Sequence, residues 1–161
     1  MSWTRATFRA TYLRPTILGA VDGLITSFVI VAGGLASDAP TRVTTLIGFS
    51  SLVADGISMG VSEGLSSRAQ DGELTPKSAT LLGCACFLGF VSFGSAPLVG
   101  YVIGRTDASR QFLSAFFFLS FLILTGAFRG VVAEQTVWKA VVEVVLLGSV
   151  AGGVAYGIAS L

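Results

Sequence analysis

Five long apolar stretches dominate this sequence and constrain its fold more than any other feature. Charged residues and prolines separate the stretches, which cover approximately residues 16–36, 45–65, 79–103, 112–128 and 140–161. A helix of about 20 mostly apolar residues is long enough to cross the hydrocarbon layer of a bilayer. We therefore expect an all-α fold, a polytopic membrane protein with five transmembrane helices.

The composition agrees with this expectation. Of the 161 residues, 53% are hydrophobic and 12% are charged, whereas soluble domains carry about 25% charged residues. A net charge of +1 argues against a nucleic-acid partner, and the absence of histidine excludes imidazole metal ligands and Ser-His catalysis. Cys84 and Cys86 would point in different directions on a helix, so we interpret them as small apolar fillers.

The chain is expected to form a single transmembrane domain over residues 1–161. Residues 1–15 mix aromatic and basic side chains, which suits a cytosolic interfacial helix, although a short disordered tail fits equally well. Basic residues are unevenly divided between the two sides of the membrane. Seven share the side of the N-terminus (Arg5, Arg9, Arg14, Arg68, Lys77, Arg129, Lys139) and three lie opposite (Arg42, Arg105, Arg110). The positive-inside rule then predicts a cytosolic N-terminus and a C-terminus outside the cell or in a lumen.

Four acidic residues fall inside the predicted spans: Asp22, Asp55, Glu63 and Glu143. No Lys or Arg lies deep in any span to pair with them. A carboxylate at membrane depth without a basic partner must be protonated, hydrated or bound to a cation. This asymmetry predicts a cation or proton pathway, with Glu143 set apart because Lys139 precedes it by four residues and is expected to pair with it.

Asp55, Met59 and Glu63 recur at intervals of four residues, so they share one face of the second span. Two carboxylates and a thioether suit ferrous iron or manganese better than magnesium or calcium, which do not use sulfur donors. Met59 and Glu63 also have simpler interpretations. A single methionine is more often a gap-filling core residue, and Glu63 is near enough to the end of the span to be solvated.

Glycine forms a second pattern on the same two spans. Gly19 and Gly23 have the GxxxG spacing in the first span, and Gly56, Gly60 and Gly64 extend it in the second. Small residues at this spacing let helix backbones approach closely. We therefore predict that close packing brings Asp22 and Asp55 toward each other.

Two segments carry a resemblance to a known family. They are LGAVDGLITSFVIVAGGLA (18–36) and SLVADGISMGVSEGLSSRA (51–69), with weaker support from LVGYVI (98–103) and LTGAFRG (124–130). They resemble the paired signatures of the vacuolar iron transporter family. The resemblance implies a five-helix protein that dimerises around a pore on the two-fold axis. It also implies movement of ferrous iron, and often manganese, out of the cytosol in exchange for protons.

Within this resemblance, Asp22 matches the pore aspartate of the first helix and Met59 the pore methionine of the second. The sequence departs from the pattern at Pro15 and Ser51, where some members carry acids, and Asp55 resembles the acid of the shorter, prokaryote-like branch. Plant and parasite members carry a glutamate-rich metal-collecting domain after the second span. This chain has only RAQDGELTPK (68–77) there, so we identify it as a short form and expect a plasma (inner) membrane location.

Residues and resemblance together predict a homodimeric exporter of ferrous iron, with manganese as a second candidate. Asp22 and Met59 of both subunits would form the metal site, Asp55 and Glu63 would line the approach, and Asp22 would carry the exchanged proton. A passive cation channel and a non-transporting structural or assembly protein are the alternatives. An enzyme is not expected, because no nucleophile–base pair or cofactor motif is present, and the metal is cargo rather than a cofactor.

Overall fold

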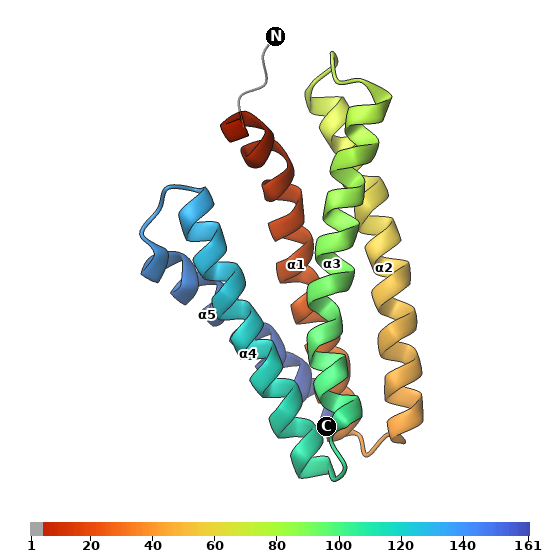
Figure 1. Ribbon diagram of the computed structural model, residues 1–161. Helices are drawn as coiled ribbons and strands as arrows, with labels where there is room; N and C mark the ends of the chain where they lie inside the picture. The colour runs from red at the N-terminus through yellow and green to blue at the C-terminus, as the bar shows by residue number, and fades with distance from the viewer. Residues whose placement is uncertain (1–4) are drawn as a thin grey trace.

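The computed structural model describes residues 5–161, with side chains from residue 11 onward, and this part of the chain is built from helices without strands. Figure 1 labels the five helices, which are α1 (Arg5–Ala36), α2 (Thr41–Gln70), α3 (Pro76–Ile103), α4 (Asp107–Val132) and α5 (Val137–Ala159). All five are long and apolar enough to cross a membrane. The expected all-α fold with five spanning helices is confirmed, and the chain is a multi-pass integral membrane protein.

The helices are longer than the apolar stretches that predict them. The shortest, α5, has 23 residues and at about 1.5 Å per residue is already longer than the roughly 30 Å hydrocarbon layer. The longest, α1, has 32 residues and includes Pro15. Its first residues, 5–15, are helical and continuous with the span, and the interfacial position of this segment stays a prediction. Residues 1–4 lie outside the described part.

Side chains at two of the turns define where helices begin. Thr75 accepts a hydrogen bond from the backbone N–H of Ser78, and Pro76 occupies the first helical position of α3. Thr106 and Ser109 form a reciprocal capping box at the start of α4, with hydrogen bonds of 2.9 and 3.2 Å. These caps satisfy backbone N–H groups that a helix start leaves free.

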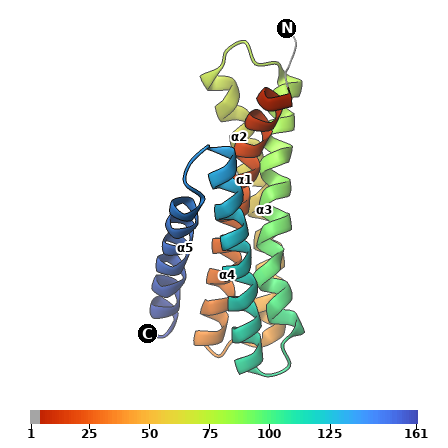
Figure 2. The same cartoon turned by 60° about the vertical axis from the view of Figure 1, so that its left-hand side comes forward.

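α1 and α3 form the centre of the bundle. They pack more extensively on each other than any other pair, and α2 contacts only these two helices within the described chain. α4 and α5 pair on the other side, where α5 reaches α1 and α4 but not α3. Figures 1 and 2 show this arrangement; in Figure 1, α2 and α5 lie at opposite edges, and the start of α1 and the end of α5 lie toward opposite ends of the bundle.

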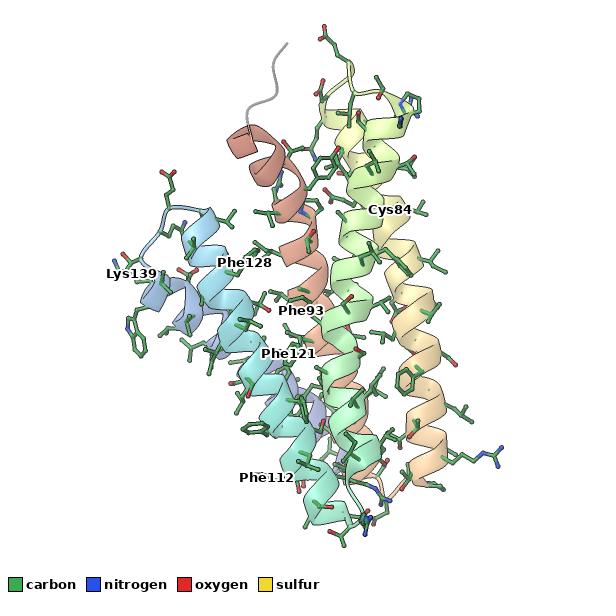
Figure 3. The ribbon with its side chains drawn as sticks, viewed as in Figure 1. Cys84, Phe93, Phe112, Phe121, Phe128 and Lys139 are labelled. Atoms are coloured by element: carbon green, nitrogen blue, oxygen red, sulfur yellow. The ribbon has the colours of Figure 1, made fainter. Side chains whose placement is uncertain are left out.

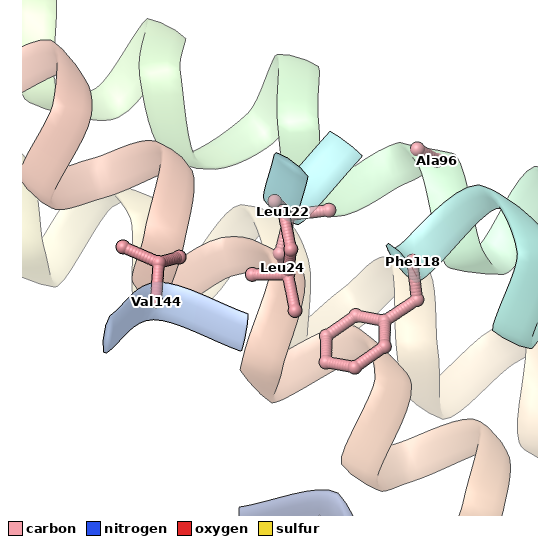
Figure 4. Close-up of a cluster of buried hydrophobic side chains, with 5 residues drawn as sticks. All are labelled: Leu24, Ala96, Phe118, Leu122 and Val144. Carbon is pink, nitrogen blue, oxygen red and sulfur yellow. The ribbon is translucent and has the colours of Figure 1, made fainter. Parts of the chain in front are cut away.

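Two clusters of buried side chains hold these helices together. The first joins four helices through Leu24, Ala96, Phe118, Leu122 and Val144 (Figure 4). It continues between α3 and α4, where the rings of Phe93 and Phe121 meet edge to face with centroids 5.7 Å apart (Figure 3). The second cluster joins α1, α2 and α3 through Val31, Leu52, Phe90, Leu98 and Tyr101. The core is therefore divided between the two sides of the central α1–α3 pair.

The outer surface of the bundle is apolar as well. Large exposed hydrophobic side chains run along the outer helices, including Leu46, Ile57, Val61, Leu65, Phe112, Ile123, Leu146, Leu147, Val150 and Val154. Soluble proteins rarely expose apolar patches of this extent. These surfaces suit contact with lipid or with another protein chain.

Candidate metal pathway

Two acids, Asp22 and Asp55, lie near the midpoints of α1 and α2. Their carboxylates are within the range of electrostatic interaction, so that they repel each other when both are charged. Both residues are exposed in the single chain. Two acids from different helices therefore share one open face of the bundle at membrane depth.

Met59 and Glu63 continue this face along α2, and both are half-buried. Met59 packs against the cluster that contains Phe90 and Leu52. Glu63 accepts a hydrogen bond of 3.3 Å from the hydroxyl of Ser67, one turn further along the helix. The four residues Asp22, Asp55, Met59 and Glu63 thus form one row, which we call the acid face.

The glycines explain how the acid face is assembled. A Cβ atom on Gly19 or Gly23 would collide with the α3 backbone at Cys86 and Phe90. A Cβ atom on Gly60 would lie 2.8 Å from the carbonyl oxygen of Gly83, also on α3. Gly19 and Gly23 of α1 and Gly60 of α2 therefore pack against α3 and not against each other. α3 is the common support that brings Asp22 and Asp55 together.

No cation neutralises the acid face within the described chain. The two ion pairs that the described side chains form are Arg110–Asp107 at 2.8 Å and Arg129–Glu143 at 3.2 Å. Among the described residues, no three acidic or cysteine side chains gather closely enough to hold a metal ion by themselves. The described part of one chain therefore supplies unpaired carboxylates without a cluster of three such acidic or thiol ligands.

Glu143 corrects the sequence-based expectation of its partner. The expected neighbour was Lys139 on the same helix, but the carboxylate pairs with Arg129 of α4. The contact is possible because α4 and α5 pack side by side as an antiparallel pair. Glu143 lies outside the acid face, and its ion pair links the end of α4 to the first turns of α5.

The structure adds residues to the acid face that sequence reasoning did not select. Ser58 and Ser62 are exposed and follow Asp55 by three and seven residues, a spacing that places them on the same side of α2. The buried thiol of Cys86 lies within electrostatic range of Asp22 and Glu63. The serines could have been found from their spacing, whereas the place of Cys86 depends on how α3 packs. Pro15 is buried and Ser51 half-buried, and neither side chain carries a charge that could replace the acids of other members.

Most of the chain matches one family model. Two overlapping segments, residues 13–75 and 71–160, match the VIT family. The chain belongs to the VIT family. The resemblance that the two signature segments carry is thereby confirmed.

Relatives of this VIT chain are named as iron transporters. The "Vacuolar iron transporter homolog 4" of Arabidopsis thaliana is 27% identical over 95% of this chain and 85% of its own length. Vacuolar iron transporters of Plasmodium falciparum and Toxoplasma gondii are 49% and 37% identical over 59 residues. These 59 residues cover 36–37% of this chain and about a fifth of each parasite protein (21% and 20%). The family supports a function in metal transport.

Proposed function

We propose that this VIT-family protein transports ferrous iron out of the cytosol, with manganese as a second substrate, in exchange for protons. The observation that carries the proposal is the pair of unneutralised carboxylates, Asp22 and Asp55, on one open face at membrane depth. A charged carboxylate that is exposed to lipid costs free energy, so acids at this depth mark sites that bind or conduct ions. Met59 adds a soft donor beside them that suits a transition metal.

The working unit in this proposal is a homodimer whose two-fold axis runs along the acid face. A second copy would cover the exposed carboxylates and remove them from lipid. Two-fold symmetry would also double the donors, giving two aspartates and two methionines from Asp22 and Met59. This doubling supplies what a single chain lacks, since one chain does not gather three metal-binding acids or thiols among its described residues.

In this proposal, metal ions and protons compete for the same carboxylate oxygens, and this competition couples metal transport to proton transport. A carboxylate in a low-dielectric site is favoured in its neutral form when empty and in its charged form when a cation is bound. Release of the metal on the far side therefore favours uptake of a proton there. Asp22 is the proposed carrier of the proton, and Asp55 and Glu63 line the approach to the metal site.

The excess of basic residues on the N-terminal side supports a cytosolic N-terminus, and the short second loop favours the plasma membrane as the location of the protein.

The test is iron uptake into proteoliposomes that contain the purified full chain, under an imposed pH gradient. We expect Asp22→Asn to reduce uptake to the level of protein-free vesicles, because the variant removes the charge and keeps the size. Asp38→Asn is the matched control: Asp38 is exposed in the turn before α2 with φ of 51°, a conformation that asparagine tolerates. Unaltered uptake by Asp22→Asn would contradict the proposal.

The same vesicles separate exchange from passive flow. An internal pH dye should report protons leaving the vesicle as iron enters, and collapse of the gradient with an ionophore should slow uptake. Iron uptake of unchanged rate without proton movement would identify a passive channel instead. Absence of any uptake, together with a melting temperature that metal does not change, would indicate a structural protein.

A further inference from the structure

A groove of about 390 Å³ runs between α2 and α3 on the outside of the bundle. Its floor exists because Gly60 and Gly83 let the two helix backbones touch, and Gly64 meets the backbone of Ala79 one turn further on. Its walls are apolar side chains such as Ile57, Val61 and Phe87. The groove is therefore an elongated apolar surface at hydrocarbon depth.

The groove lies away from the acid face. Helical residues advance by about 100° each, so Ile57 of the groove wall and Asp55 point in nearly opposite directions from α2. Cys84, which also lines the groove, is exposed on α3 beside α2 (Figure 3). If copies of the chain meet along the acid face, this groove stays open to lipid.

One end of the groove carries a positive charge. Arg68, in the last turn of α2, lines it and is exposed, and its guanidinium forms no ion pair with any side chain that the structure describes. Within the groove, the hydroxyl of Thr80 is already used, since it donates to the carbonyl oxygen of Pro76 at 2.9 Å. The groove thus offers a long apolar wall and a single charged donor at its mouth.

We propose that this groove binds one anionic phospholipid per chain. An acyl chain would lie between α2 and α3, and the headgroup phosphate would accept hydrogen bonds from Arg68. Arginine presents several N–H donors in a geometry that suits phosphate, and its place at the end of a span corresponds to the headgroup level. A lipid with net negative charge is preferred because Arg68 has no acidic partner to neutralise it. The proposal requires a membrane protein but not metal transport.

The test compares retention of phosphatidylglycerol and phosphatidylcholine with identical acyl chains. Native mass spectrometry of the full chain in detergent should show one phosphatidylglycerol retained per chain, in preference to phosphatidylcholine. Arg68→Gln should abolish this preference and leave weak binding of both lipids. Lys139→Gln is the matched control, because it removes a positive charge at an exposed site of α5 on the opposite edge of the bundle (Figure 3).

A second pair of variants tests the groove itself. Cys84→Trp places a large ring in the groove and should reduce retention of both lipids, whereas Leu88→Trp, exposed one turn further along α3 and outside the groove, should not. Melting temperatures measured without added lipid establish that each variant is folded. Equal retention of the two lipids by the unaltered chain, or an unchanged preference in Arg68→Gln, would overturn the proposal.

A second copy of the chain is the other possible occupant of this groove. Disulfide formation at Cys84 would detect a second copy in the groove, because the Cys84 thiol is exposed there and Cys86 is buried. An oxidant should leave the chain uncrosslinked when lipid occupies the groove. An efficient Cys84–Cys84 crosslink in vesicles, lost in Cys84→Ser, would show that the groove is an interface between copies and would overturn lipid binding.

Discussion

Met59 illustrates how one residue supports two interpretations. Its place between Asp55 and Glu63 suggests a soft ligand on the acid face. It also packs against the cluster that joins α1, α2 and α3, as a gap-filling methionine would. The side chain is half-buried, so it reaches both the core and the acid face. Only a variant that keeps the volume and removes the sulfur separates the two roles.

Met59→Leu is that variant. We expect ferrous iron transport to fall by roughly tenfold or more, the scale on which changes around a metal site act. The free energy of unfolding should change by less than about 1.5 kcal/mol, because leucine and methionine are similar in volume. Proteoliposome uptake and thermal unfolding in detergent measure the two quantities. A loss of stability with unchanged transport would assign Met59 to the core alone.

The central element is α3, on which both α1 and α2 pack closely. Gly23 of α1 and Gly60 of α2 each approach the α3 backbone so closely that a Cβ atom would collide. The sequence spacing predicts close approach by these glycines but does not name the partner. GxxxG describes a flat strip on one helix, and any helix with a matching surface satisfies it.

Gly23→Ala should therefore weaken the α1–α3 contact. A Cβ atom there would meet the carbonyl oxygen of Phe90 and lie 3.0 Å from its carbonyl carbon, and overpacking of this kind costs about 1–3 kcal/mol. Gly33→Ala is the matched control on the same helix, where the nearest atom would be the Cβ of Ala159 at 3.8 Å. It should be neutral or stabilising by up to about 1 kcal/mol.

Thermal unfolding of both variants in the same detergent measures this difference. The comparison cancels the general effect of replacing glycine by alanine in a helix, because both positions lie within α1. Equal melting temperatures for Gly23→Ala and Gly33→Ala would contradict the close contact between α1 and α3.

At the scale of the whole molecule, α2 has two exposed sides with different chemistry. One carries Asp55, Ser58 and Ser62, and the other carries Ile57 and Val61 with the groove between α2 and α3. α2 contacts neither α4 nor α5 within the described residues, so it lies at an edge where a second copy could dock. The polar side suits the two-fold axis and the apolar side suits lipid.

Crosslinking tests this division. In a Cys84→Ser background, Ser58→Cys should form a disulfide-linked dimer in oxidised vesicles, because Ser58 lies on the acid face. Ile57→Cys, at the adjacent position but on the groove side of α2, should remain monomeric on a non-reducing gel. The reverse result would move the dimer interface to the groove, and no crosslink from either position would contradict a dimer formed along α2.

The sequence by itself determined the five spanning helices, since a long apolar run has no other stable form in a bilayer. It also determined that Asp55, Met59 and Glu63 share one face of α2, because helical periodicity is a local property. Tertiary structure decided which helices meet. In the folded chain, Gly19, Gly23 and Gly60 pack on α3, and Asp22 lies within electrostatic range of Asp55. Glu143 pairs with Arg129 instead of Lys139. These contacts depend on packing between residues far apart in the chain, and no local spacing encodes them.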